Sequence, residues 1–266
     1  MNTAPIGMFD SGLGGLSVWQ KVRELLPKES LIYFADSANC PYGPRTREEI
    51  IHLCESIVEV LLDRSCKLIL VACNTATASA IQHLRQRYPV PFVGMEPAIK
   101  PAVQQTRSRK IGVLATEGTF RGKHFLDTRK RFAEGIDVYV QVGEGLVEIV
   151  EKGKMDSDEA RQLLQQYVLP MLEQGVDQIV LGCTHYPFLR RMIEEIVGEG
   201  VAVIDPAPAV ARQVKTQLEA RDLLSPSEAH PVYECLTTGN PDGLQHMIQR
   251  ILPESEASRI ELRQVS

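Results

Sequence analysis

Two stretches of this sequence share one pattern, in which a run of apolar residues ends at a cysteine that a threonine follows within two positions. The first is LILVACNTAT at residues 68–77, and the second is QIVLGCTHYP at residues 178–187. Short apolar runs of this kind are typical of buried parallel strands, and a helix-like segment follows each of them. The cysteines, Cys73 and Cys183, therefore end two similarly built strand–turn–helix units.

The similarity extends on both sides of the two cysteines. Downstream of each cysteine is a tripeptide of an acidic residue, proline and alanine. It starts at Glu96 after Cys73 and at Asp205 after Cys183, so the two intervals are almost equal. Upstream, the strand-like run IGMFDS has a counterpart in IGVLAT. We therefore predict two half-molecules of like fold. The alternative is that the similarity is only the strand–turn–helix pattern that any two α/β units share.

Composition places the chain among ordinary globular proteins. Its 266 residues are 44% hydrophobic and 24% charged, enough for one large or two small domains with a substantial core. No apolar run approaches the roughly 20 residues that a membrane-spanning helix needs. The first residues lack the basic and apolar regions of a secretory signal. We therefore expect a cytoplasmic protein without a membrane partner.

Charge and cysteine usage argue against further classes. The net charge is −5 and the basic residues are scattered, so we expect no nucleic-acid partner. The six cysteines are sparse and should be free thiols in a reducing compartment. A C-x-x-C redox motif is absent, and only Cys183 and His185 offer metal ligands close in sequence. A catalytic disulfide and a metal site are both disfavoured.

Two loops after predicted strands carry polar residues of interest. Asp10 opens a glycine-rich loop that has Ser17 where a dinucleotide fingerprint needs its third glycine, so a dinucleotide site is not expected. Asp10 is placed for charge chemistry, with helix capping as the alternative. The loop CPYGP at residues 40–44 follows a strand at 31–35. We interpret it as a shaped binding loop, with a tight turn set by two prolines as the alternative.

The remaining pattern predicts alternating helices and strands. Thr46 and Glu49 form a capping box for a helix that continues to residue 64. Further elements are expected as helices at 145–152, 157–174, 209–221 and 242–252 and as a strand at 232–237. The segments beyond residue 206 have no counterpart in the repeat. We predict an α/β fold of two similar parallel-sheet domains, near 1–97 and 98–206, related by a pseudo-twofold axis.

The two cysteines are placed for proton chemistry. Ligands of parallel α/β sheets bind beyond the carboxyl ends of the strands, where Cys73 and Cys183 both fall. A helix N-terminus should lower the pKa of such a thiol from about 8.5 and favour the thiolate. If the halves face each other across a cleft, one thiolate removes a proton from one face of a carbon while the other thiol protonates the opposite face. Two buried structural cysteines remain the alternative.

Four motifs in this order resemble the glutamate racemase family of the aspartate/glutamate racemase superfamily: FDSGLGGLSV, PYG, ACNTAT and GCTHYP. The resemblance covers residues 6 to about 212. It implies that the active site lies in the cleft between the domains. It also implies that the tail, residues 207–266, packs back on the first half, so that the domains are 1–97 plus 207–266 and 98–206.

The resemblance further implies a cofactor-independent enzyme that interconverts L- and D-glutamate and supplies D-glutamate for peptidoglycan, with neither pyridoxal phosphate nor metal. Cys73 would act on the D-enantiomer and Cys183 on the L-enantiomer, with Asp10 and His185 as assisting groups. The residues expected to bind substrate are Asp10, Ser11, Tyr42, Gly43, Asn74, Thr75, Thr116, Thr119, Thr184 and His185. Asp36 and one glutamate of the 145–152 helix, Glu148 or Glu151, are further candidates for assisting groups.

Two other functions remain open. An aspartate racemase or another isomerase of the superfamily has the same two-cysteine plan, although the PYG and GCTHYP motifs favour glutamate. A non-catalytic two-domain binding protein also fits a cleft between like halves, but it gives no reason for a cysteine at both equivalent strand ends. The expected partner is glutamate, and a homodimer is the expected assembly.

Overall fold

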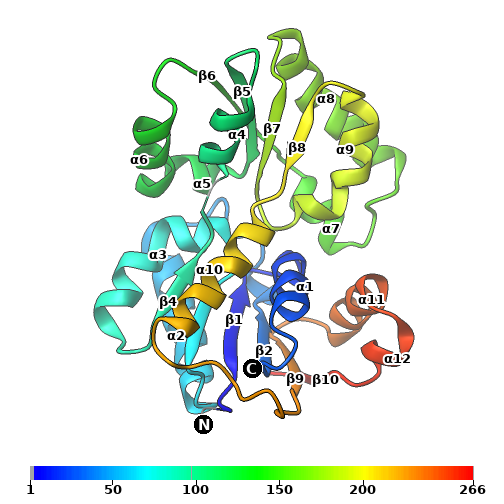
Figure 1. The fold of residues 1–266 in the computed structure, drawn as a ribbon. Coiled ribbons are helices and arrows are strands. Elements are labelled where there is room, and N and C mark those ends of the chain that lie inside the picture. The colour runs from blue at the N-terminus through cyan, green and yellow to red at the C-terminus, as the bar shows by residue number, and fades with distance from the viewer. Residues whose placement is uncertain (1–2, 97, 266) are drawn as a thin grey trace.

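The computed structural model describes residues 3–96 and 98–265, which form two lobes, one above the other in Figure 1. Parallel strands form the centre of each lobe. In chain order these are β1 (Ile6–Asp10), β2 (Leu31–Ala35), β3 (Leu68–Val71), β4 (Phe92–Gly94), β5 (Lys110–Ala115), β6 (Asp137–Val142), β7 (Gln178–Gly182), β8 (Ala202–Ile204), β9 (Tyr233–Thr237) and β10 (Glu261–Gln264).

Helices follow most of the strands and cover the sheets. They are α1 (Leu16–Leu25), α2 (Arg47–Asp63), α3 (Asn74–Arg87), α4 (Ile99–Gln105), α5 (Glu117–Arg121), α6 (Lys123–Phe132), α7 (Leu146–Glu151), α8 (Asp158–Glu173), α9 (Arg190–Val197), α10 (Ala207–Glu219), α11 (Pro241–Ile251) and α12 (Glu254–Ala257), with short 3₁₀ turns η1 (Ser37–Asn39) and η2 (Tyr186–Leu189).

The two sheets repeat one topology. Within the described residues, the lower lobe has the strand order β10-β9-β2-β1-β3-β4 and the upper lobe β6-β5-β7-β8, with every pairing parallel. The order β2-β1-β3-β4 therefore matches β6-β5-β7-β8 strand for strand. The prediction of two similar parallel α/β units is confirmed, and β3 and β7, which precede the two cysteines, are equivalent strands.

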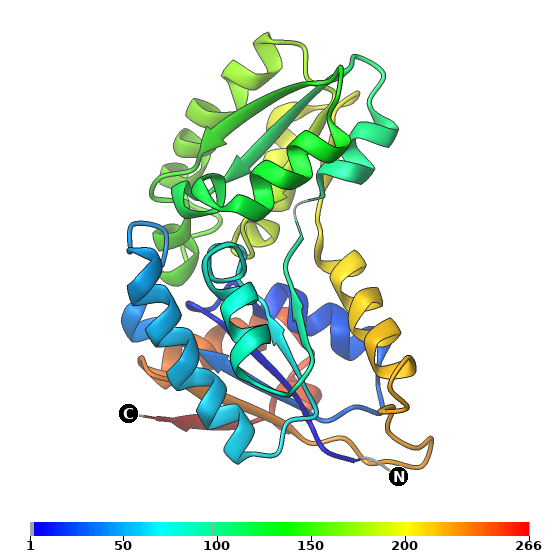
Figure 2. The same cartoon turned by 90° about the vertical axis from the view of Figure 1, so that its left-hand side faces the viewer.

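Strands β9 and β10 extend the lower sheet beyond β2 and have no counterpart in the upper one. The chain crosses between the lobes twice, between β4 and α4 and between β8 and α10, as Figure 2 shows. The predicted domains, 1–97 plus 207–266 and 98–206, would meet at these crossings, and this division stays a prediction. Pro97, at the first boundary, lies outside the described residues.

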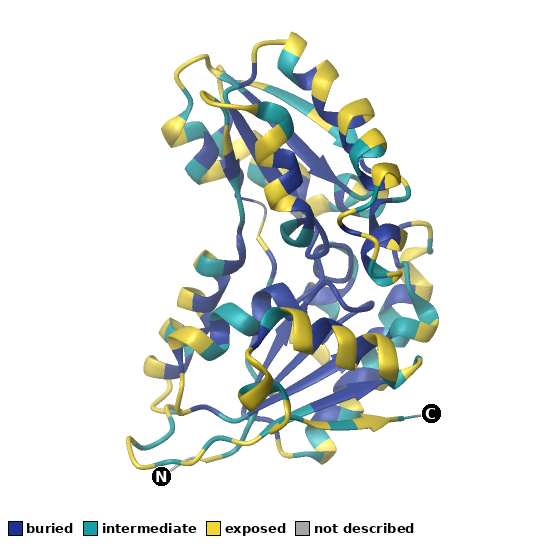
Figure 3. Ribbon diagram, turned by 90° about the vertical axis from the view of Figure 1, so that its right-hand side faces the viewer, coloured by how far each residue is buried: buried dark blue, intermediate teal, exposed yellow. Residues whose placement is uncertain are grey.

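Burial on both faces explains why the central strands are almost wholly apolar. Every residue of β1, β2, β3 and β7 is buried. Alternate residues of β1 face different cores, since Ile6 and Met8 pack against α1 and α10 while Phe9 packs with the residues under α2 and α3. Buried residues also fill the loops where the lobes meet (Figure 3). The junction is therefore part of the core.

Local sequence signals set most of the element boundaries. Thr46 and Glu49 form the predicted capping box at the start of α2. The predicted helix at 157–174 is α8, and Ser157 accepts a hydrogen bond from the backbone of Ala160. The pattern missed α4, because Pro101 suggests a loop, yet proline is tolerated in the first turn of a helix. It also missed the edge strands β6 and β10, which are partly exposed and lack a continuous apolar run.

A buried ion pair joins the tail to the lower lobe. The Glu29 carboxylate lies 2.6 Å from the Lys67 ammonium, and both side chains are 2% exposed. The same carboxylate accepts hydrogen bonds from the backbone N–H and the hydroxyl of Ser225, at 2.7 and 2.9 Å. Ser225 lies in the segment between α10 and β9, so this pair fixes the return of the tail.

Replacing Glu29 with glutamine should lower the free energy of unfolding by about 3 kcal/mol, because it removes the charge that balances a buried ammonium. Urea denaturation at neutral pH measures the change. Glu24→Gln is the control, since Glu24 pairs with Lys21 on the surface and its loss should cost under about 1 kcal/mol. Equal effects of the two substitutions would contradict the role given to the buried pair.

Candidate active site at the lobe junction

Cys73 lies at the carboxyl end of β3 and caps α3. Its Sγ accepts a hydrogen bond from the Ala76 N–H at 3.5 Å and lies 3.8 Å from the Ser11 hydroxyl. Ser11 in turn contacts the Asp10 carboxylate through its backbone N–H, at 2.8 Å, and its hydroxyl, at 3.4 Å. The loops after β1 and β3 therefore bring a thiol, a hydroxyl and a carboxylate together.

The environment of Cys73 overturns one expectation. The predicted helix N-terminus is present, and its N–H groups act to lower the pKa of this thiol. Burial raises the pKa more strongly, the Asp10 carboxylate raises it further, and the net result lies well above the ordinary value. The prediction of a lowered pKa was wrong for Cys73, because it counted the helix N-terminus and left out burial.

Asp10 connects the two lobes. It is fully buried and accepts hydrogen bonds from the backbone N–H of Gly15 at 2.6 Å and from the Thr184 hydroxyl, in the upper lobe, at 3.2 Å. Burial raises the pKa of its carboxyl, and the nearby His185 acts against this shift. Asp10 therefore partly matches both interpretations. It accepts a hydrogen bond at the start of α1, as a capping residue would, and it also faces the loop of Cys183, as a residue of the site would.

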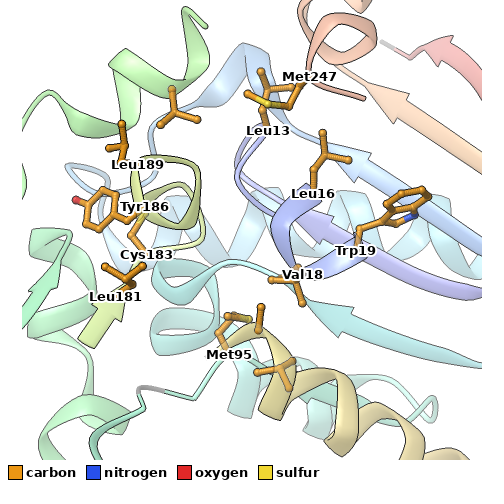
Figure 4. Packing of buried hydrophobic residues seen from close by; sticks show 14 of the residues in the cluster. Leu13, Leu16, Val18, Trp19, Met95, Leu181, Cys183, Tyr186, Leu189 and Met247 are labelled. Atoms are coloured by element: carbon orange, nitrogen blue, oxygen red, sulfur yellow. The ribbon is translucent and has the colours of Figure 1, made fainter. Parts of the chain in front are cut away.

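Cys183 ends β7 in the position equivalent to Cys73. Its Sγ lies 3.7 Å from Nδ1 of His185, and the other ring nitrogen, Nε2, lies 2.6 Å from Oε1 of Glu151. Figure 4 shows Cys183 beside Tyr186 and Leu189, at the edge of the large core. The Cys183 thiol therefore lies next to the His185 imidazole, and the Glu151 carboxylate orients this ring through its other nitrogen.

Hydrogen bonding sets the charge of His185. Burial lowers the pKa of this imidazole, but its hydrogen bonds with Cys183, Cys40 and Glu151 outweigh that effect and raise the pKa well above its ordinary value. The side chain is 1% exposed. The geometry therefore supports a protonated imidazole beside Cys183.

The sequence predicted a helix directly after Cys183, but Thr184 does not begin one. The residues after Cys183 form a turn and then the 3₁₀ turn η2, and α9 begins only at Arg190. Pro187 lies in η2 and has no N–H to donate. The expected helix N-terminus is present after Cys73 but absent directly after Cys183.

The glycines of the loop after β1 make room for the upper lobe. A side chain at Gly12 would place its Cβ 2.1 Å from Oε1 of Glu151, and one at Gly14 would place it 2.2 Å from Nδ1 of His185. The Leu13 N–H between them donates to Glu151 at 2.6 Å. Close backbone approach is therefore the role of these glycines, and they approach side chains of the upper lobe.

A second polar contact crosses the junction on another side. The hydroxyls of Thr75 and Thr116 lie 2.8 Å apart, and Thr116 lies 3.0 Å from the hydroxyl of Thr119. Gly43 packs beside Thr116 and lines, with it, a cavity of about 270 Å³ between the PYG loop and residues 142–148. These predicted substrate residues come together at the mouth of the junction.

Asn74 and Tyr42 differ in what their side chains contact. Asn74 is buried at the start of α3, and within the described residues neither polar atom of its side chain has a hydrogen-bond partner. The Tyr42 hydroxyl donates to Asp36, which also accepts from Asn39 and Thr238. Asp36 therefore holds the PYG loop in place and does not reach the thiols.

The structure assigns contacts to three side chains that the sequence alone could not place: Glu151, Ser17 and Cys40. Of the two candidate glutamates on α7, Glu151 contacts His185, whereas Glu148 is exposed. The periodicity of α7 could not separate them, because residues three apart share a helix face. Ser17 donates to the backbone oxygen of Thr184 at 2.9 Å, a contact that no local pattern signals. Cys40 lies within 4.8 Å of Glu151 and His185, and these three side chains are the ones placed to hold a metal ion among the described residues.

The sequence pattern of the Asp/Glu/Hydantoin racemase family matches residues 6–214. The chain belongs to this family. A glutamate racemase of Herpetosiphon aurantiacus is 50% identical over 241 residues, which are 91% of this chain and 95% of that protein. The predicted resemblance to glutamate racemases is thus confirmed. In addition, no helix of the described residues is long and apolar enough to cross a membrane.

Solved structures show the same relationship. Glutamate racemase RacE1 of Bacillus anthracis aligns with a TM-score of 0.89 at 31% identity, covering 100% of this chain and 98% of that one. The Escherichia coli glutamate racemase, solved with L-glutamate and an activator, aligns with a TM-score of 0.84 at 30% identity, covering 98% of both chains. An aspartate racemase homologue of Pyrococcus horikoshii aligns with a TM-score of 0.52 at 19% identity, which shows the fold alone.

Replacing Glu151 with glutamine should lower the pKa of His185, because it removes the negative charge that stabilises the imidazolium. NMR titration of the imidazole measures the direction of this shift. Glu148→Gln, on the same helix but exposed, is the matched control and should leave the titration unchanged. An unshifted His185 in Glu151→Gln would show that Glu151 is not its counter-charge.

Proposed function

We propose that this chain is a glutamate racemase that interconverts L- and D-glutamate by proton transfer between two cysteines. The observation that carries the proposal is the pair of equivalent strand ends, after β3 and β7, each with a cysteine facing the lobe junction. Cys73 reaches Asp10 through Ser11, and Asp10 reaches the loop of Cys183 through Thr184. The two thiols therefore belong to one polar network.

In one direction, the Cys183 thiolate removes the α-proton of L-glutamate while the Cys73 thiol protonates the opposite face of the carbon. The reverse reaction exchanges these roles, so one thiol and one thiolate are needed in each direction. The D-specific role of Cys73 and the L-specific role of Cys183 follow the family pattern. No cofactor is required for the proton balance, because each turnover starts and ends with one proton on the pair.

The groups around each thiol govern its ionisation. Cys73 is buried beside the Asp10 carboxylate, which disfavours its thiolate. A substrate ammonium bound next to Asp10 would offset that charge, so the base forms where the amino acid is present. On the other side, the His185 imidazole lies beside the Cys183 sulfur, and Glu151 orients the ring. Asp10 and His185 thus tune the two thiols without themselves transferring the α-proton.

Substrate binding is proposed for the polar groups that surround the thiols. Asn74 is a buried amide with no partner within the described residues, and such groups normally bind a ligand or water. It begins α3 together with Thr75, at a helix N-terminus suited to a carboxylate. Ser11, Thr184, Thr116, Thr119 and the PYG loop, including Tyr42 and Gly43, complete the proposed site.

Glutamate is preferred over aspartate as the proposed substrate because the close relatives are named glutamate racemases. The similar E. coli structure was solved with L-glutamate, and a Francisella tularensis glutamate racemase with a TM-score of 0.84 was solved with D-glutamate. D-glutamate for peptidoglycan, a cytoplasmic location and a homodimer remain parts of this proposal. A non-catalytic binding protein is not favoured, because binding alone needs no thiol at both strand ends.

Cys73→Ser and Cys183→Ser should each abolish racemisation, because a serine hydroxyl is far too weakly acidic to replace a thiolate. The assay is circular dichroism of each glutamate enantiomer, with incorporation of solvent deuterium at the α-carbon measured in parallel. Cys54→Ser, which replaces a buried cysteine of the lower lobe core, controls for loss of a thiol. Full activity in either active-site variant would rule out the two-base mechanism.

The single-cysteine variants should also show opposite stereochemical preferences. With an amino acid that carries a β-leaving group, each variant retains one base and should eliminate from one enantiomer only. Cys183→Ser should act on the D-enantiomer and Cys73→Ser on the L-enantiomer. The same preference in both variants would contradict the mirror arrangement of the thiols.

Asp10→Asn should slow racemisation by less than either cysteine substitution, because it removes a tuning charge and leaves both proton-transferring atoms in place. The neutral amide should also lower the pKa of Cys73. The pH dependence of Cys73 alkylation, followed by peptide mass spectrometry, is therefore expected to move to lower pH. Unchanged turnover in both directions would show that Asp10 has no catalytic influence.

A further inference from the structure

Three potential metal ligands meet at one edge of the proposed site. Cys40 lies in the loop between η1 and α2, Glu151 ends α7, and His185 follows β7. One ligand atom from each lies within 4.8 Å of the other two. The shortest of these separations joins Nε2 of His185 and Oε1 of Glu151, at 2.6 Å. They come from three segments far apart in sequence, so no spacing motif signals them.

The three side chains match the preferences of a thiophilic divalent cation. Zinc binds thiolate sulfur at about 2.3 Å and imidazole nitrogen or carboxylate oxygen at about 2.0 Å. Tetrahedral geometry at these bond lengths separates ligand atoms by roughly 3.3–3.8 Å. The observed cluster needs only small side-chain movements to reach those separations. A thiolate and a carboxylate would also balance both charges of the cation.

We propose that Cys40, Glu151 and His185 form a binding site for Zn²⁺, and that zinc bound there inhibits the reaction at Cys183. Glu151 faces Nε2 of the ring, whereas Cys183 faces Nδ1. A cation between Glu151 and the ring therefore takes Nε2 and replaces the proton shared there. Because Cys40 belongs to the lower lobe and the other two ligands to the upper one, the cation also ties the lobes together and hinders the opening that a substrate needs to reach Cys183.

The cation has a route that does not pass the thiols of the reaction. Glu151 has 19% of its side chain exposed and Cys40 is half-buried, whereas His185 is 1% exposed. Zinc can therefore reach the cluster from the side of Cys40 and Glu151. Binding would engage both lobes, since Cys40 belongs to the lower lobe and the other two ligands to the upper one. The closed junction is thus the form that zinc should stabilise.

The first test measures binding without reference to activity. Chelator-treated protein is titrated with ZnCl₂ against a chromophoric zinc indicator. Cys40→Ser and Glu151→Gln should each weaken binding about tenfold or more. Cys73→Ser and Glu148→Gln, which keep all three ligands, should bind zinc as the unmodified chain does. Equal affinity of Cys40→Ser and the unmodified chain would overturn the site, and weaker binding by Cys73→Ser would place the metal at the reaction's own thiols.

Cobalt supplies a measurement that does not depend on the variants folding. Co²⁺ added to the unmodified chain should show a thiolate charge-transfer band and the visible bands of a tetrahedral ion, and ZnCl₂ should abolish both. The absence of these bands at saturating cobalt would contradict a cysteine-containing site.

The inhibition rests on the proposed function, whereas the binding does not. Racemisation by the unmodified chain should fall as zinc is added and recover with chelator. For Cys40→Ser, compared with its own zinc-free rate, about tenfold more zinc should be needed. A chain that binds zinc but has no racemase activity would refute the proposed function and leave the site standing. A racemase that binds zinc at Cys40 without losing activity would refute the inhibition.

Discussion

One carboxylate from each lobe accepts a hydrogen bond from the opposite lobe, and the rest of the site depends on this exchange. Asp10, from the lower lobe, accepts from the Thr184 hydroxyl, and Glu151, from the upper lobe, accepts from the Leu13 N–H. A carboxylate withdrawn from water needs hydrogen-bond donors, so each lobe supplies one of the donors that the other lobe's carboxylate requires in the closed form. The same contacts place both cysteine loops at one junction. Closure and assembly of the catalytic groups are therefore a single event.

Closure also has to be reversible for an amino acid to enter. The polar contacts that cross the junction include hydrogen bonds of Thr184 and Leu13 and the threonine pair Thr75 and Thr116, each of which water can replace. Apolar side chains of both lobes also meet there in one core. The chain crosses between the lobes at only two places within the described residues, near β4 and near β8. Hinge-like opening would exchange these polar contacts with water and separate the apolar contacts that the lobes share, while the sheets within each lobe stay intact. The fold thus separates the part that holds shape from the part that moves.

Much of this architecture could be predicted from the sequence, because its signals are local or repeated. The apolar runs before Cys73 and Cys183, the capping box at Thr46 and the equal spacing of the halves each correspond to an element now observed. The groups around the thiols could not be derived in the same way. Glu151 and Glu148 are indistinguishable by periodicity, and the raised pKa of Cys73 depends on burial and on the Asp10 carboxylate, which the fold brings near it. Contacts between the lobes join residues at no fixed separation in the sequence, so no local pattern predicts them.

The repeat accounts for the position of the two cysteines, and the departures from it account for their chemistry. Equivalent strands deliver Cys73 and Cys183 to equivalent places, but the strand that ends at Asp10 in the lower lobe ends at Ala115 in the upper one. The upper lobe supplies its charged partner differently, through His185 in the turn after Cys183 and Glu151 behind it. One thiol therefore faces a carboxylate and the other an imidazolium. A symmetric repeat would give the two thiols identical surroundings, whereas this structure places the Asp10 carboxylate near Cys73 and the His185 imidazole beside Cys183. The two sides of the junction are therefore chemically distinct, although equivalent strands build them.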